Sequence, residues 1–133
     1  MKRSIYFFIA VMSIIIAMSG CRKDIYGCTD PSGYNYNSAA NANNGTCTYA
    51  VMFWTNVNEG VVTVTIAGQT GTITGFVTGG QPNCGNSVSA NFYLPAGTYT
   101  YTAVAPSSPA YPSGYSISGS AQAISGVCQA YQL

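Results

Sequence analysis

Histidine is absent from this chain, and charged side chains are scarce: four residues are Lys or Arg and three are Asp or Glu. General acid–base catalysis needs titratable groups that a fold can bring together, and glycoside hydrolysis needs two carboxyls that face one sugar. The three carboxyls here are the widely spaced Asp24, Asp30 and Glu59. Ser and Thr are plentiful, but no His is present to activate one as a nucleophile. We therefore expect a protein that is not an enzyme and that has no catalytic residue and no cofactor.

Basic patches are also missing, and after Asp30 the only formal charge is Glu59. Nucleic-acid binding depends on Lys and Arg that neutralise phosphates, so we expect no nucleic-acid partner. Low charge combined with few apolar residues would indicate disorder, but 47% of this chain is hydrophobic. The 133 residues predict one small folded domain with an N-terminal appendage.

The N-terminus has the pattern of an export signal. Lys2 and Arg3 precede an apolar stretch, residues 5–18, that is too short for a permanent membrane span. The following Met18-Ser19-Gly20-Cys21 resembles the bacterial lipobox. This resemblance implies that residues 1–20 are removed and that Cys21 carries a diacylglyceryl group and an N-terminal acyl chain such as palmitate. The alternative is an ordinary secretory signal in which Cys21 is incidental.

The resemblance to lipoproteins also carries an expectation about location. The membrane would be the first partner, reached through the lipid on Cys21, with residues 21–26 as a short tether. Arg22 stands where lipoproteins retained at the inner membrane often have Asp. The resemblance therefore implies the outer membrane of a Gram-negative cell envelope and leaves open which face the protein occupies.

Four cysteines remain after Cys21, an even number that can pair in an oxidising compartment. Three pairings are possible. We favour Cys28–Cys47, within one polar segment, and Cys84–Cys128, within the strand-rich region. A four-thiolate zinc site is the alternative, but closely spaced cysteine pairs and His are both missing.

Residues 27–49 contain Gly27-Cys28-Thr29-Asp30-Pro31, then Asn35-Tyr36-Asn37 and Gly45-Thr46-Cys47. The pattern resembles a short module of Gram-negative surface proteins that is often likened to calcium-binding repeats. Asp30 is the only acidic residue here, because Asn43-Asn44 stand where the module has two carboxylates. Calcium prefers several carboxylate and carbonyl oxygens, so Asp30 is a weak calcium candidate. The other interpretation is a disulfide-closed loop with turns at Asp30-Pro31 and Asn44-Gly45.

Residues 50–133 alternate between apolar and polar side chains with period two, which predicts strands. The runs around residues 49–54, 62–66, 88–94 and 98–103 are the clearest. A further run is expected through Ile73 to Val77, and short pieces at 115–118, 121–124 and 127–133. Seven or eight strands with frequent turn signals predict an all-β fold, a single antiparallel β-sandwich.

One motif refines this fold prediction. Leu94-Pro95-Ala96-Gly97-Thr98-Tyr99 resembles the tyrosine corner of Greek-key sandwiches, in which a Tyr hydroxyl bonds back to the backbone. It is also similar to immunoglobulin-like and transthyretin-like modules of surface proteins. This resemblance implies a structural role and no activity.

Tyrosine is abundant, with eleven residues in all. An uncharged surface rich in Tyr, Asn and Gln suits a protein partner or a neutral glycan. The loop 106–112 is an exposed binding loop or a proline-stiffened connector. The strands also lack charged residues that would guard sheet edges, so self-association is a second hypothesis. We expect a non-catalytic envelope lipoprotein that displays a β-sandwich for binding or assembly. The alternatives are a structural subunit that polymerises through its edges and a glycan-binding accessory lipoprotein of an uptake complex.

Overall fold

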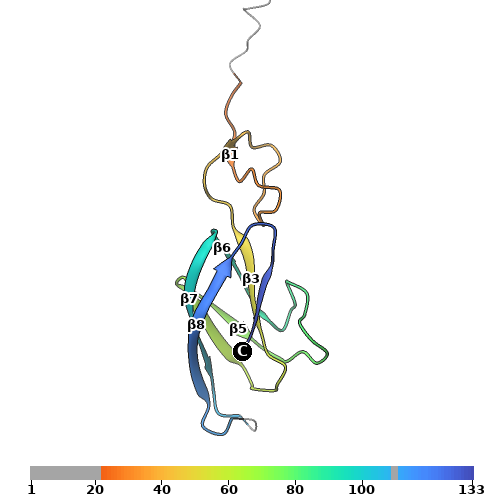
Figure 1. The fold of residues 1–133 in the computed structure, drawn as a ribbon, viewed down its shortest axis with the longest axis vertical. Helices are drawn as coiled ribbons and strands as arrows, with labels where there is room; N and C mark the ends of the chain where they lie inside the picture. The colour runs from red at the N-terminus through yellow and green to blue at the C-terminus, as the bar shows by residue number, and fades with distance from the viewer. Residues whose placement is uncertain (1–21, 109–110) are drawn as a thin grey trace, which may run out of the picture.

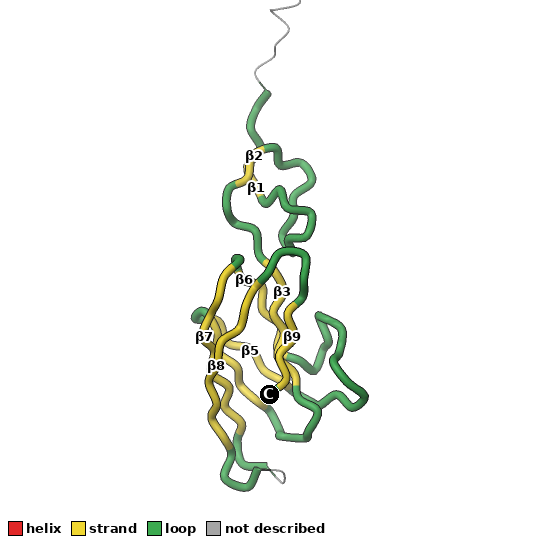
Figure 2. Tube along the Cα trace, viewed as in Figure 1, coloured by secondary structure: helices red, strands yellow, loops and turns green. Residues whose placement is uncertain are grey.

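The computed structural model describes residues 22–108 and 111–133, which contain nine strands and no helix (Figures 1 and 2). The expected leader, residues 1–20, and the expected acylation site, Cys21, lie outside the described residues. None of the described residues belongs to a helix that could cross a membrane. The strands are β1 (Tyr26–Gly27), β2 (Ala42–Asn43), β3 (Tyr49–Trp54), β4 (Val62–Ile66), β5 (Gln69–Ile73), β6 (Ala90–Leu94), β7 (Gly97–Ala105), β8 (Tyr115–Ala123) and β9 (Gln129–Gln132).

The strands form three separate sheets. β1 and β2 make a small parallel pair, β6-β3-β9 form a three-stranded sheet, and β5-β4-β7-β8 form a four-stranded sheet. The prediction of an all-β chain is therefore confirmed. The prediction of purely antiparallel pairing is wrong for β3 and β9, which run parallel. Both strands start at the end of the domain next to the segment 27–49, β3 because the chain arrives from that segment and β9 because β8 ends there (Figure 1).

One hydrophobic cluster draws residues from both larger sheets. On β4 the expected alternation holds, with Val62, Val64 and Ile66 buried and the two threonines between them exposed. β6 shows the same alternation of buried and more exposed side chains, as predicted. On β3 both faces are buried, so Met52 and Trp54 join Val51 and Phe53 inside. β3 is the central strand of its sheet, and period two alone did not indicate its second buried face.

Two strand boundaries differ from the expected ones. β5 ends at Ile73 and does not continue to Val77, because the Val77 N–H donates to the Thr55 carbonyl at the end of β3 (2.9 Å). The two short pieces expected after residue 115 are one strand, β8, which pairs with β7 along all nine residues. β3 spans Tyr49–Trp54, as the period-two run at 49–54 predicted.

Two turns show how local sequence sets the strand pairing. β4 and β5 are joined by Ala67 and Gly68, both with positive φ (50° and 74°), which is the geometry of a type I′ hairpin turn. Between β6 and β7, the Tyr99 hydroxyl donates to the Pro95 carbonyl at 2.9 Å. The bond back to the backbone expected from the tyrosine-corner motif is therefore present.

Candidate functional site

Both predicted disulfides are present, Cys28–Cys47 and Cys84–Cys128, with Cα–Cα distances of 4.8 and 6.3 Å. The first closes the segment 27–49. The second joins the long connection between β5 and β6 to the start of β9. The first pair therefore constrains the chain before β3 in the sequence, and the second pair constrains the chain after it.

Asp30 lies where the segment 27–49 meets the β domain. One of its carboxylate oxygens, Oδ2, accepts hydrogen bonds from Ser125 Oγ (2.6 Å) and Tyr49 Oη (2.7 Å). The other, Oδ1, accepts from the Ser32 N–H (2.9 Å). These donors, with Ser125 contributing most and Tyr49 next, lower the pKa of Asp30 from 3.8 to about 2, because each favours the charged form.

The contacts of Asp30 bear on its candidacy as a calcium ligand. Three protein donors already point at its oxygens, and a cation at Oδ2 would have to displace two hydroxyl groups. Across residues 22–108 and 111–133, no group of three or more His, Cys, Asp or Glu is placed to hold a metal ion. The role that the geometry supports for Asp30 is that of a joint between the segment 27–49 and the β domain.

A second contact strengthens this joint. The Tyr34 ring in the segment stacks on the Tyr93 ring of β6, with centroids 3.5 Å apart and planes 20° from parallel. Within the segment, the Tyr34 N–H donates to the Thr48 carbonyl (2.8 Å) and so holds Tyr34 in place for this stack. A shallow hollow of about 310 Å³ opens beside this stack, lined in part by Tyr34, Tyr49 and Val127. Hydrogen bonds and aromatic stacking together fix the segment on the end of the domain.

The opposite end of the domain holds a different kind of site, around Glu59. The Glu59 residue is only 3% exposed, although it lies in the turn between β3 and β4. Its Oε2 accepts a 2.5 Å hydrogen bond from the Tyr115 hydroxyl at the start of β8. Burial, and then the bond to Glu59, raise the pKa of Tyr115 above its usual value. No other described residue donates to the Glu59 side chain.

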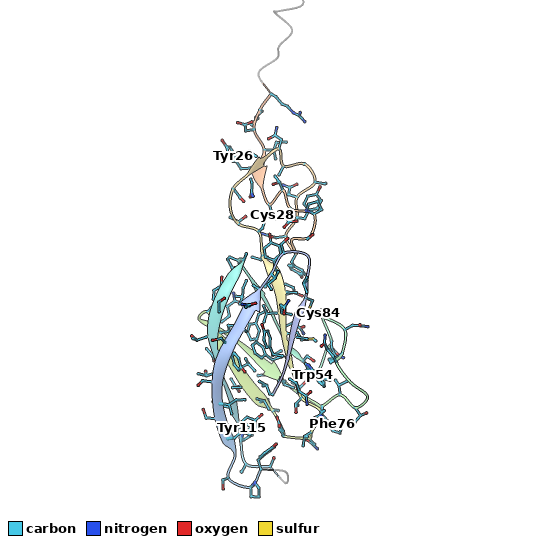
Figure 3. The ribbon with its side chains drawn as sticks, viewed as in Figure 1. Tyr26, Cys28, Trp54, Phe76, Cys84 and Tyr115 are labelled. Carbon is cyan, nitrogen blue, oxygen red and sulfur yellow. A yellow bond between two sulfur atoms is a disulfide. The ribbon has the colours of Figure 1, made fainter. Side chains whose placement is uncertain are left out.

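Glu59 lines a small pocket of about 230 Å³ together with Tyr111, Tyr115, Ile117 and Leu133. We call this the distal pocket, because it lies at the end of the molecule away from the tether, where Figure 3 labels Tyr115. The pocket forms because the long β7–β8 hairpin extends past the strands of the other sheet. On β8, inward-facing Ala121 and Ala123 are buried by the other sheet, whereas Ile117 on the same face is 38% exposed.

The sequence did not indicate this pocket. Glu59 lies in the turn between β3 and β4, and nothing local indicates that its carboxylate turns inward to reach Tyr115, 56 residues away. One signal was available: Glu59 is the only charge after Asp30. The loop 106–112, predicted to be either a binding loop or a proline-stiffened connector, contributes Tyr111 to the pocket, and its Pro109 and Ala110 lie outside the described residues.

The chemistry available at the distal pocket is limited. The other two carboxyl groups of the sequence belong to the tether (Asp24) and to the joint (Asp30), at the opposite end of the molecule (Figure 1). The side chains of the pocket therefore offer one carboxylate, two phenols and an aliphatic wall. This is a set of groups for binding a small ligand.

Comparison with protein-family models, with curated proteins and with solved structures finds no match for this chain.

Proposed function

We propose that this chain is a non-catalytic lipoprotein of the bacterial cell envelope, anchored through Cys21. In this proposal the anchored chain displays an immunoglobulin-like β-sandwich for binding or assembly. The observation that carries the proposal is the order of parts along the long axis: the tether, the fixed segment 27–49 and the β domain (Figure 1), with the distal pocket around Tyr115 at the far end (Figure 3). An anchor at one end and a pocket at the other is the arrangement expected of a module held away from a membrane.

The sandwich assignment is supported by two observations. The three- and four-stranded sheets contribute side chains to one core. The Tyr99–Pro95 hydrogen bond matches the tyrosine corner of Greek-key sandwiches. Outer-membrane localisation and the absence of a catalytic role belong to the same proposal, and they rest on the lipobox resemblance and on the shortage of titratable groups.

Intact-mass analysis of the protein extracted from isolated membranes tests this proposal. We expect the mass of the chain from Cys21 onward plus a diacylglyceryl group and one acyl chain, with no free thiol. A Cys21→Ala variant is the matched control and should lose the acyl mass and accumulate uncut. Recovery of the wild-type chain from the cytosol, with residues 1–20 attached and reduced thiols, would overturn the proposal.

Assembly through a sheet edge is the second candidate function, and a feature of β8 favours it. The Gln122 N–H on the free side of β8 is capped by the Tyr131 hydroxyl (2.7 Å). Because backbone groups alternate in direction, Ser116, Ser118 and Ser120 direct theirs to the same free side. Their side chains are exposed and uncharged. This stretch could add a strand from a second copy.

Sedimentation of the full chain in detergent, from low to high micromolar concentration, tests the second candidate. Self-association through β8 predicts larger species that Ser118→Lys disrupts, since a charge on an edge strand opposes pairing. Thr63→Lys adds the same charge to the exposed face of the interior strand β4 and should leave the species unchanged. Monomers at every concentration exclude this assembly, and a glycan array on the same preparation then tests the glycan-binding alternative.

A further inference from the structure

Glu59 is buried, and no residue in the described part of its chain provides its carboxylate with a positive partner. It is 3% exposed, and its one described hydrogen bond comes from the neutral hydroxyl of Tyr115. After Lys23 the sequence contains no Lys, Arg or His. Arg22 and Lys23 belong to the tether at the opposite end of the molecule (Figure 1). A buried carboxylate is unfavourable unless an opposite charge or several donors compensate it, and a positive counter-charge at this site would come from another molecule, because the described part of the domain provides none.

The walls of the distal pocket restrict what that molecule can be. Ile117 and Leu133 provide an aliphatic surface, and Tyr111 and Tyr115 provide two rings whose centroids lie 5.1 Å apart at 73°. Cations are attracted to aromatic faces, and an alkyl chain that carries a cation packs along apolar side chains while its head stays at a polar site. With Tyr111 40% exposed and Ile117 38% exposed, the pocket is open to solvent.

The volume of the distal pocket also indicates a small ligand. Its volume of about 230 Å³ is below the range of about 300–1,000 Å³ usual for drug-sized ligands. A short aliphatic chain with one charged end fits such a volume, whereas an oligosaccharide or a nucleotide does not. A single carboxylate also provides too few oxygens for a calcium ion, which takes six to eight.

We propose that the distal pocket binds a primary ammonium group on a short aliphatic chain, with Glu59 as its counter-ion. Tyr111, Ile117 and Leu133 contact the chain, and Tyr115 holds the carboxylate in position. Both a free alkylamine and a lysine side chain of a protein partner have this chemistry. The inference rests on the proposed function, because it names the ligand class of a displayed binding domain.

A purely structural interpretation has to be separated from this one. The Glu59–Tyr115 hydrogen bond also ties the β3–β4 turn to β8, and a buried side chain can be retained for that contact alone. Glu59→Gln distinguishes the two. The Gln carbonyl can accept the same hydrogen bond from Tyr115 in nearly the same volume, but it has no charge with which to attract an ammonium group.

The test is a titration of the full chain in detergent micelles, followed by NMR at the amides of Tyr115 and Ile117. The probes are n-butylammonium and its neutral counterpart 1-butanol, and the peptide acetyl-Gly-Lys-Gly-amide with and without Nε-acetylation. We expect millimolar binding of at least one ammonium probe and at least tenfold weaker binding of its neutral counterpart. Binding of n-butylammonium alone assigns the site to free amines, and binding of the Lys peptide assigns it to lysine side chains.

The variants are measured with the same probes. Glu59→Gln should weaken ammonium binding at least tenfold, and Asp24→Asn, which removes a carboxylate from the tether, should leave it unchanged. Equal binding of ammonium and neutral probes, or no binding of either ammonium probe, overturns the inference whether or not Glu59→Gln folds. If the acylated chain is found in the membrane but no ammonium binds, the inference fails and the proposed function stands. If ammonium binds but the chain is never acylated, the proposed function fails and the inference about the distal pocket stands.

Discussion

The hydroxyl of Tyr49, the first residue of β3, donates a 2.7 Å hydrogen bond to the Asp30 carboxylate in the segment 27–49. Ser125, from the connection between β8 and β9, donates to the same oxygen. One carboxylate therefore links the segment to two parts of the β domain, at residues 49 and 125, that lie 76 residues apart in the sequence. The position of the segment thus depends on a titratable group.

Acid should weaken this joint. The folded-state pKa of Asp30 is about 2, below its ordinary value of 3.8, so its contribution to stability is complete above about pH 4 and is lost as the pH falls toward 2. Asp30→Asn should lower the stability at pH 7 and remove this part of the acid dependence, since Asn is uncharged and replaces one of the two accepting oxygens with an NH₂ group that can only donate. Urea unfolding of both proteins between pH 2 and pH 7 measures the difference. A parallel pH dependence in the two proteins would contradict the assignment.

Ser125 offers a more specific control, because its hydroxyl lowers the pKa of Asp30 more than any other group. Ser125→Ala should raise the pKa of Asp30 toward 3.8 without removing the carboxylate. An NMR titration of the Asp30 side chain would detect this change directly, and an unchanged titration would show that the Ser125 contact is absent in solution.

Tyr99→Phe removes the hydroxyl that bonds to Pro95 and leaves the ring in place. We expect a loss of about 1 kcal/mol of stability, the usual net value of one such hydrogen bond. Tyr26→Phe is the matched control, because Tyr26 is 66% exposed and should tolerate the change. Chemical denaturation of the two variants provides the comparison. Equal stabilities would show that the corner bond contributes nothing.

Ala67→Asn should stabilise the β4–β5 hairpin. Ala67 has φ 50°, a left-handed conformation that costs an L-residue about 1–2 kcal/mol, and Asn-Gly is the preferred pair in type I′ turns. We expect a gain of about 0.5–1 kcal/mol and a melting temperature several degrees higher. Ala96→Asn makes the same exchange at an exposed alanine without positive φ and should have little effect.

Gly119→Ala should destabilise the four-stranded sheet. A Cβ atom at Gly119 would lie 2.8 Å from the hydroxyl oxygen of Tyr101 and 2.9 Å from two of its ring carbons. Tyr101 is opposite Gly119 on β7 and packs against the Phe53 ring (centroids 4.6 Å apart), so it has little room to move. We expect a loss of about 1–3 kcal/mol in calorimetry. Replacing Tyr101 by Leu should relieve most of it, and additive losses would contradict the proposed contact.

Removal of the second disulfide tests the constraint on the long β5–β6 connection. Cys84 and Cys128 are 44 residues apart, and the chain-entropy model gives about 4 kcal/mol for a loop of this length. Cys84→Ser with Cys128→Ser should therefore lower the unfolding free energy by about that amount in urea. Neither side chain is buried, so Ser fits without a cavity. A loss below 1 kcal/mol would indicate that the connection is held by other contacts.

Much of the fold could be predicted from local patterns. Period-two runs indicated β4, β6 and β7 with their buried faces, because alternate side chains of a strand point to opposite sides. The Pro95-to-Tyr99 motif indicated a bond that closes within five residues. The two disulfides followed from the position of the cysteines in two compositionally distinct regions. Each of these features is encoded by residues close in sequence or by a small number of possible pairings.

Other features were decided only when distant segments came together. The parallel pairing of β3 and β9, the joint at Asp30 and the burial of Glu59 against Tyr115 all join residues at least 19 positions apart. A local pattern does not predict such contacts, because the burial of a side chain depends on which distant residues pack against it. The sequence by itself determined that this is a nearly uncharged all-β chain with one carboxylate in its domain. Only the tertiary structure decided that this carboxylate faces a pocket, since the long β7–β8 hairpin extends past the opposing sheet.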